Sequence, residues 1–209
     1  MPTPQQNNKV KYGLKNVHYA VLTEAANGDI SFAAPKRIPG AISVSLAATT
    51  ARKILAADDS YYWTAESIAN YTGDANFARI PDEFRADCLG EQTDSASGVK
   101  YGTNVPTTTR FALLFEFDGD AHKTRYVLYN CTASKPQIAG QTVNPDDGPD
   151  PSQGTETVTI TAAALSNTLM YSHCKPGDSI TTGTGENTVT TNIYDTWFTN
   201  VFMPTLAAA

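Results

Sequence analysis

Hydrophobic and polar positions alternate most clearly in two runs, FALLFEF at 111–117 and RYVLYNC at 125–131, which flank the polar segment DGDAHK. A period of two predicts β-strands, because successive side chains of a strand point to opposite faces. Asp-Gly is a favoured turn dipeptide, so the whole stretch predicts a β-hairpin. Each run carries one alternating set: Phe111, Leu113, Phe115 and Phe117 on the first, and Val127, Tyr129 and Cys131 on the second.

The second face of this hairpin is also apolar, since it carries Ala112, Leu114 and Leu128. A lone hairpin of this kind is at best marginally stable in water. We therefore expect both faces to be covered, one by the core and the other by a helix or a neighbouring chain.

Further strands are predicted on both sides of this hairpin. VHYAVLT at 17–23 is followed by an Asn-Gly turn and a return strand at 30–32. AISVSLA at 41–47 alternates Ile42, Val44 and Leu46 with serines, which predicts a strand with one buried face. Frequent threonine favours strands elsewhere, including TETVTIT at 155–161.

The segment between these strands is harder to assign. Residues 51–57 lean towards helix by composition, but the sequence leaves helix and strand open. A turn at 58–60 precedes a strand with an aromatic start at 61–68, and we expect Gly73-Asp74 to break the polar strand that follows.

The best helix signal is IPDEFRADCLG. Pro81 suits the first helical position, acidic residues suit the first turn, and Gly90 suits the C-terminal cap. Ile80, Phe84 and Cys88 recur every four residues, so this helix, at 81–89, should pack one face on a sheet. The final segment, NIYDTWFTNVFMP, also has apolar residues at helical spacing, ending before Pro204.

Three polar stretches separate or precede these elements. Residues 1–10 read as a flexible N-terminal arm, and the remaining 11–209 as a single domain. Residues 91–105 form a long polar loop, a kind that is usually functional or disordered within a compact domain. Residues 175–187 read as a Gly/Thr/Ser connection.

Composition narrows the classes of function. A formal net charge of −6, with no basic run longer than Lys36-Arg37, argues against wrapping nucleic acid. No apolar run is long enough to span a bilayer, so no membrane partner is expected. Three widely spaced cysteines argue against a disulfide framework, and we expect them to be packing residues. Charged residues are only 17%, which favours an assembling surface.

No set of residues predicts a catalytic or metal site. The DGDAHK segment lacks the further acids of a calcium loop, so we interpret it as a turn. Asp146, Asp147 and Asp150 fit a solvated acidic loop, and His173-Cys174 has no second ligand pair at zinc spacing. We expect no enzyme activity and no cofactor, and the pattern as a whole indicates a self-assembling structural protein.

An ordered series of segments supports a family resemblance: KYGLKNVHYAVLT, ILAADDSYY, a short helix ending in CLG, a long loop, FALLFEFDGDAHKTRYVLYNC and TETVTITA. Over about 12–163 the chain resembles the major tail protein, or tail tube protein, of long-tailed bacteriophages with flexible, non-contractile tails. No resemblance is evident from residue 165 onward, so 165–209 is interpreted as a possible variable C-terminal extension.

The resemblance implies a mainly β fold, a β-sandwich or barrel of two packed sheets flanked by one short helix. It also implies hexameric rings that stack into a tube in the virion, assembled in the host cytoplasm, through which DNA is ejected into the host. Partners would be further copies and the tape measure, tail terminator and distal tail proteins, with phage DNA passing non-specifically through the lumen.

Two segments would make the contacts between subunits in this reading. The long loop would contact the neighbouring ring through Glu91, Gln92, Thr93, Asp94, Ser95, Gly98, Val99, Lys100, Tyr101 and Val105. The N-terminal arm would bridge subunits through Pro4, Gln5, Lys9 and Val10.

Two other classes of function stay open. One is a different virion protein with a similar sandwich, such as a tail terminator or a head-decoration protein. The other is a carbohydrate-binding module, for which Tyr61-Tyr62-Trp63 and Trp197 would have to be exposed and coplanar.

Overall fold

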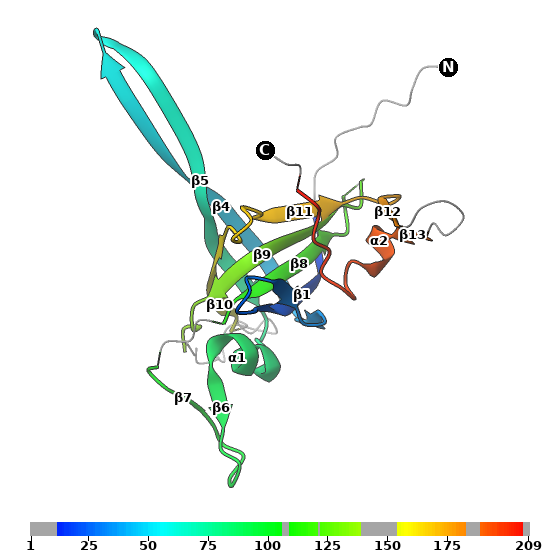
Figure 1. Ribbon diagram of the computed structural model, residues 1–209. Helices are drawn as coiled ribbons and strands as arrows, with labels where there is room; N and C mark the ends of the chain where they lie inside the picture. The colour runs from blue at the N-terminus through cyan, green and yellow to red at the C-terminus, as the bar shows by residue number, and fades with distance from the viewer. Residues whose placement is uncertain (1–11, 106–108, 121, 139–153, 183–188, 207–209) are drawn as a thin grey trace, which may run out of the picture.

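The fold was analysed in a computed structural model that describes residues 12–105, 109–120, 122–138, 154–182 and 189–206. It is mainly β, with antiparallel strands and two short helices, as expected for a β-sandwich with a flanking helix (Figure 1). In chain order the elements are β1 (Leu14–Glu24), β2 (Ile30–Phe32), β3 (Lys36–Arg37), β4 (Ala41–Ala57), β5 (Ser60–Phe77), α1 (Asp82–Leu89), β6 (Glu91–Thr93), β7 (Lys100–Gly102), β8 (Phe111–Phe117), β9 (Arg125–Ala133), β10 (Glu156–Ala163), β11 (Tyr171–Cys174), β12 (Ser179–Thr182), β13 (Val189–Asn192) and α2 (Ile193–Thr196).

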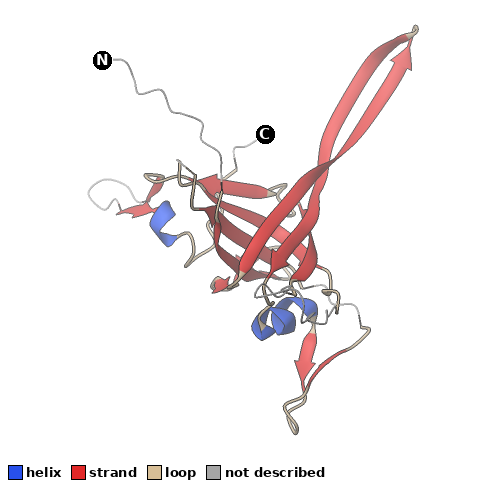
Figure 2. Ribbon diagram, turned by 180° about the vertical axis from the view of Figure 1, so that it is seen from behind, coloured by secondary structure: helices blue, strands red, loops and turns tan. Residues whose placement is uncertain are grey.

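One curved sheet supplies both layers of the sandwich. Its strand order is β2-β1-β8-β9-β10-β5-β4, with β3 paired to β1 and β11 paired to β9. β9 is the branch point, because Arg125 to Leu128 pair with β11 while Asn130 to Ala133 pair with β10. The sheet therefore turns at β9, and the β10-β5-β4 part packs back over β1-β8-β9 (Figure 2).

The DGDAHK segment is the turn of the β8–β9 hairpin, as predicted. Asp120 accepts hydrogen bonds from the backbone amides of His122 and Thr124, each at 3.0 Å. Asp118 forms an ion pair with Lys15 at 2.7 Å. The two carboxylates of this segment thus serve the turn and the adjoining strand β1.

Both faces of the β8–β9 hairpin are covered. The inner face joins the main core with β1, β5, β10 and α1, and the outer face joins a second cluster with Leu165, Leu169, Cys174 and Trp197. The cover of the second face is therefore the C-terminal part of the same chain, beginning at Leu165 (Figure 1).

One residue of the predicted alternation lies on the other face. Cys131 is in the inner core, whereas Val127 and Tyr129 are in the outer cluster. The register shifts between the pairs Phe111–Cys131 and Leu113–Leu128, which places one extra residue in β9. Such a β-bulge reverses the inside-outside order beyond it, and this is why strict alternation fails here.

The predicted helix and its buried face are confirmed. Ile80, Phe84 and Cys88 are all buried, and the Phe84 ring meets Tyr19 and Phe111 edge-on at 5.0 and 5.4 Å. Gly90 closes the helix in the left-handed conformation, with φ of 71°. Pro81 stands at the N-cap rather than at the first helical position.

The C-terminal segment packs well but is less helical than predicted, since α2 is only four residues long. Arg125 anchors it: the guanidinium donates to the carbonyl oxygen of Tyr194 and lies 3.7 Å from the centre of the Tyr194 ring. Trp197 is buried, and its indole N–H donates to the carbonyl oxygen of Tyr126 at 3.3 Å. Burial against the sheet, rather than a long helix, holds this segment.

The long hairpin β4–β5 resolves one assignment that the sequence left open, at 51–57, and corrects two expectations, the break at Gly73-Asp74 and the burial of Ile42. Residues 51–57 are strand, and β5 continues through Gly73-Asp74 without a break. A Cβ at Gly73 would overlap the carbonyl oxygen of Ser45, so glycine here permits close approach of β4. Ile42 is exposed, because a register shift between Ala41 and Ser43 makes it the extra residue of a bulge.

The segment at 175–187 also differs from prediction, in that Ser179–Thr182 pair with β13 to form a small hairpin. The expected strands at 17–23, 30–32 and 155–161 are present as β1, β2 and β10. No helix in the described part of the chain is long and apolar enough to cross a membrane.

Candidate assembly surfaces

The most prominent feature of the surface is the distal part of the β4–β5 hairpin, residues 48–69, here called the arm. It projects far from the sandwich (Figure 1, cyan; Figure 2). None of its residues is buried, and none belongs to either core cluster. β10 pairs with β5 only from Asn70 to Phe77, so along the arm each strand has only the other as a partner among the described strands.

The tip of the arm combines a tight turn with exposed apolar side chains. Asp58 and Asp59 both have positive φ, 53° and 56°, as a two-residue turn of a twisted hairpin requires. A register shift between Leu55 and Ala56 pairs Leu55 with Trp63 and Ala56 with Tyr61. Leu55 and Trp63 therefore lie on one face of the arm, and Tyr61 lies on the other.

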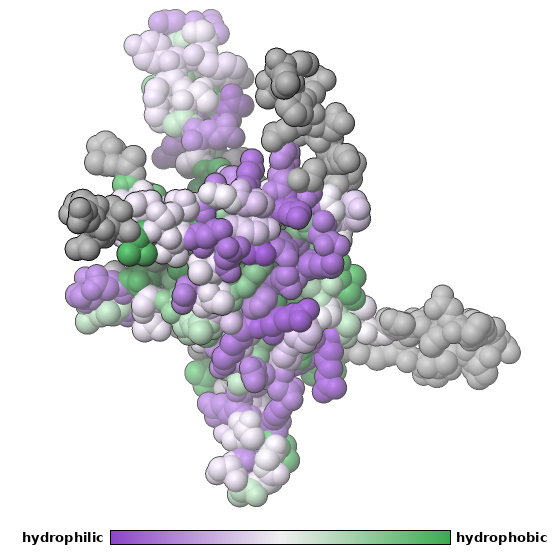
Figure 3. All heavy atoms as spheres, turned by 90° about the vertical axis from the view of Figure 1, so that its right-hand side faces the viewer, coloured by the Kyte–Doolittle hydropathy of each residue, from purple (hydrophilic) through white to green (hydrophobic). Residues whose placement is uncertain are grey.

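The second projecting feature lies at the opposite end of the molecule (Figures 1 and 3). Residues 91–105, predicted to be a loop, contain the antiparallel strands β6 and β7. The turn between them is held by Asp94, whose carboxylate accepts from the amides of Ala96 and Ser97, each at 3.2 Å. The Ser97 hydroxyl also donates to Asp94, and this bond is the main reason that the pKa of Asp94 is lowered; the two amide bonds lower it further. Gly98 completes the turn with φ of 72°.

The base of the β6–β7 hairpin is tied to α1 and the sheet. Arg85 contacts Glu91 at 3.1 Å and Glu156 at 2.7 Å. Lys100 forms an ion pair with Asp82. Burial alone would lower the pKa of Arg85, but these two carboxylates outweigh it and raise the pKa. Arg85 thus holds the hairpin at its base through Glu91, and Lys100, opposite Thr93 beside the turn, ties the other end of β7 to the start of α1.

Some of the predicted contact residues bond within the chain, others are exposed, and Tyr101 does both. Glu91, Asp94 and Lys100 are used within the chain, and Gln92 accepts a hydrogen bond from the Tyr101 hydroxyl at 2.7 Å. Exposed side chains or backbone occur at Thr93, Ser95, Gly98, Val99, Tyr101 and Val105. Val99 and Val105 are 61% and 65% exposed, and Figure 3 shows pale and green residues at the end of this hairpin.

The N-terminal contacts predicted at Pro4, Gln5, Lys9 and Val10 lie outside the described residues. The same holds for the acidic loop at 146–150.

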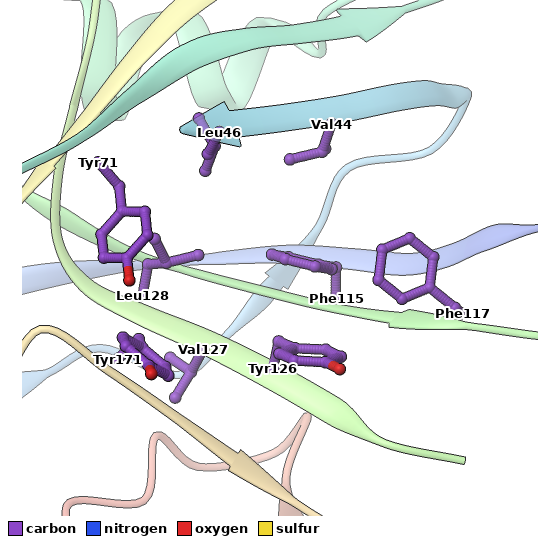
Figure 4. A pocket seen from close by; sticks show the side chains of 9 residues that line it. All are labelled: Val44, Leu46, Tyr71, Phe115, Phe117, Tyr126, Val127, Leu128 and Tyr171. Carbon is purple, nitrogen blue, oxygen red and sulfur yellow. The ribbon is translucent and has the colours of Figure 1, made fainter. Parts of the chain in front are cut away.

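An apolar cleft of about 400 Å³ opens between the two layers near the base of the arm (Figure 4). One wall comes from β4 and β5, and the other from β8, β9 and β11. The lining residues are Val44, Leu46, Tyr71, Phe115, Phe117, Tyr126, Val127, Leu128 and Tyr171. Phe115 stacks on Tyr126 at 5.6 Å, and Tyr71 meets Tyr171 edge-on at 5.7 Å, so the walls are pre-formed aromatic surfaces.

Of the residues weighed for chemistry, the cysteines serve packing. All three cysteines are free and buried, and burial raises the pKa of Cys88 and of Cys174 to about 12. His173 lies beside the ring of Tyr126 at 5.9 Å. Across the described ranges, no three His, Cys, Asp or Glu side chains gather closely enough to hold a metal ion.

Comparison with known proteins places the chain in no family. No protein-family model matches it, and no curated protein matches it significantly.

The arm is the feature that sequence reasoning missed. The signal was present, because runs of similar length flank Asp58-Asp59 and both contain small and β-branched residues. That the two strands pair along their whole length, and that no other part of the described chain covers their outer half, depends on the tertiary structure.

Proposed function

We propose that this protein is the tail tube protein of a bacteriophage with a flexible, non-contractile tail. Copies of the chain form hexameric rings that stack into a tube, and the tube is the conduit for DNA. The proposal rests on the resemblance of residues 12–163, and the observation that carries it furthest is the pair of hairpins at opposite ends of one sandwich (Figure 1).

The arm supports assembly because it has no core of its own. A two-stranded hairpin is at best marginally stable in water. Here it extends through residues 48–69 without one buried side chain, while Ile54, Leu55, Tyr61, Tyr62, Trp63 and Ile68 are exposed. Association with other copies would bury these side chains and hold the arm in its extended form.

The edges of the sheet support assembly in the same way. β4 ends the strand order, so one edge of this 17-residue strand has no partner among the described strands. An unpaired edge is a template for pairing with another chain, and closure into a ring removes it.

The outer face of β5 and β10 suits a wall along which DNA slides. Thr159 donates to Asp74 at 2.9 Å, and Thr72 donates to Thr161 at 3.3 Å. Asn70, Asn76 and Thr157 share this face, so these positions carry one carboxylate, two amides and several hydroxyls rather than Lys or Arg. Such a face offers no cation to bind phosphate groups.

Electron microscopy of the purified protein at increasing concentration tests the proposal. We expect stacked rings and tubes; isolated single rings or trimers would favour a tail terminator or head-decoration protein, and a monomer at all concentrations would refute the proposal.

The hairpin at 91–105 is tested with a variant that keeps its anchoring ion pairs. Deleting the whole segment would remove Glu91, the partner of Arg85, so V99S/Y101S is the sharper change. We expect it to fold normally and to form rings that do not stack. Ile138→Ser is the control, because it removes a fully exposed apolar side chain that belongs to neither hairpin. Normal tubes from V99S/Y101S would refute the role of this hairpin.

The structure gives less support to a carbohydrate-binding module. Trp197 is buried, and the register at the tip places Tyr61 and Trp63 on opposite faces of the arm. These aromatic residues therefore do not form one flat platform for a sugar ring.

A further inference from the structure

Two features of this chain present apolar side chains to solvent: the tip of the arm and the cleft at its base. Contact between them would bury apolar surface on both. The tip carries Leu55 opposite Trp63, 55% and 52% exposed. Within the arm this is the pair in which two large apolar side chains stand directly opposite each other, because Ile54 faces Thr64 and Tyr61 faces Ala56. The Leu55–Trp63 face is therefore the most hydrophobic part of the tip.

The cleft has the properties of a receptor for such side chains. Its volume of about 400 Å³ lies within the range of sites that bury a small ligand. Val44, Leu46 and Tyr71 line one wall, and Phe115 and Leu128 line the other (Figure 4). Tryptophan and other aromatic side chains that fill a preformed apolar pocket are the usual energetic centre of a protein–protein interface.

The tip cannot occupy the cleft of its own chain. Leu46 lines the cleft and Leu55 lies nine residues farther along the same continuous strand. At roughly 3.3 Å per residue the two are separated by about 30 Å. The hairpin is paired over this whole distance, so it cannot fold back while β4 and β5 remain intact.

The occupant is therefore sought in a second copy of the chain, where tip and cleft are both available. A contact between different surfaces of two identical chains is heterologous, and it closes into a ring or continues as a filament. Charge favours this seating as well, because the turn at the tip carries Asp58 and Asp59. In the β8–β9 turn, beyond the Phe117 end of the cleft, Asp118 is already paired with Lys15 and Asp120 is buried against backbone amides, so Lys123 is the exposed charge that this turn leaves for the tip.

We propose that the Leu55–Trp63 face of one copy seats in the cleft lined by Val44, Leu46, Tyr71, Phe115 and Leu128 of the next copy. This deepens the proposed function and rests on it in taking a second copy as the partner. It gives the arm a receptor, and it makes every chain both donor and acceptor of one repeated contact.

Two serine variants of the arm test which face is used. L55S/W63S removes the proposed plug, and I54S/Y61S removes the apolar side chains of the opposite face as the matched control. Sedimentation velocity over a concentration series should show that L55S/W63S raises the concentration for half-maximal association by about 30-fold or more. The control should stay within a few-fold of wild type. Equal effects of the two variants, or a larger effect of the control, would overturn the proposal.

The acceptor side is tested with Tyr171→Glu, which places a charge at the mouth of the cleft. Tyr171 is 48% exposed, so the variant should fold, and thermal unfolding checks that it does. Leu46→Glu, on the opposite wall, is the second variant. Both should lose association to a similar extent as L55S/W63S, and normal association by both would overturn the proposal.

Mixing the two kinds of variant gives the decisive result. L55S/W63S keeps its cleft and Tyr171→Glu keeps its tip, so each should be monomeric alone and the mixture should form 1:1 pairs that grow no further. Absence of such pairs would overturn the arm-in-cleft contact.

The outcomes separate this inference from the proposed function. Tubes that persist in all these variants would refute the inference and leave the function standing. Arm-dependent pairs or chains of wild type without rings or tubes would refute the function and leave the contact standing. A strictly monomeric wild type would refute both.

Discussion

Replacement of Trp197 by alanine tests whether the C-terminal segment is part of the folded core. Trp197 is 1% exposed, lies against the outer face of the β8–β9 hairpin and donates to the carbonyl oxygen of Tyr126. A buried tryptophan removes about 150–250 Å² from water, worth about 4–6 kcal/mol at 25 cal/mol per Å². Measured truncations of large aromatic residues cost about 3–5 kcal/mol, and we expect a loss of unfolding free energy in that range.

The assay is urea denaturation followed by far-ultraviolet circular dichroism, because fluorescence would lose one of its two tryptophans. Trp63→Ala is the matched control, since Trp63 is 52% exposed on the arm and should change stability by no more than about 0.5 kcal/mol. Trp197→Phe keeps a ring but loses the hydrogen bond to Tyr126, and should cost about 1–3 kcal/mol. The protein is kept dilute, so that association does not contribute.

A loss below about 1 kcal/mol for Trp197→Ala would refute this packing. The second face of the β8–β9 hairpin would then need another cover, such as a neighbouring chain. An equal loss for Trp63→Ala would show instead that the arm contributes to the stability of the monomer.

Three further predictions concern other parts of the fold. Gly73→Ala should lower the unfolding free energy measured by urea denaturation by about 1–3 kcal/mol or more, because the new methyl group meets the backbone of Ser45. Asp87→Asn should weaken the loss of unfolding free energy as pH falls. Burial would raise the pKa of Asp87, but hydrogen bonds from Lys36 and Tyr19 outweigh it and lower the pKa. The stabilising contribution of Asp87 is therefore present above about pH 4 and is lost as pH falls through the pKa of the folded state. The buried cysteines, including Cys88 with a pKa of about 12, should not react with a thiol reagent at pH 8 until the protein unfolds.

Each of these has a clear contrary result. Wild-type stability in Gly73→Ala would mean that β4 does not approach β5 as described. An unchanged acid limb in Asp87→Asn would show that the Asp87 network is not formed in solution. Rapid thiol modification of the folded protein would show that at least one cysteine is accessible.

Local patterns predicted the elements that depend on neighbouring residues. The β8–β9 hairpin, its turn and the helix with Phe84 on its buried face follow from alternation, Asp-Gly and a four-residue repeat. Such signals depend only on the backbone geometry of a few residues, so they predict an element without knowledge of the fold. The Cys131 bulge could not be predicted, because its position is decided by the register with β8.

The candidate assembly surfaces were predicted only in part. Residues 91–105 were predicted to be a long loop that contacts the neighbouring ring, but the strands β6 and β7 and the anchoring of Glu91 by Arg85 depend on residues brought together by folding. Sequence reasoning divided the arm into an ambiguous segment at 51–57, a turn at 58–60 and a strand at 61–68, and expected a break just beyond it at Gly73-Asp74. Its continuity depends on cross-strand pairing, with Gly73 placed where two backbones come close.

The sequence alone thus determined that this is a β protein whose central hairpin has two apolar faces, because side-chain alternation is a property of a single strand. It did not determine what lies on the second face. The two tryptophans show why: Trp197 is buried and Trp63 is exposed, although both stand in similarly aromatic segments. Burial of a side chain depends on which segments, distant in sequence, pack against it. The tertiary structure places the sheet against Trp197 and leaves the tip of the arm facing solvent.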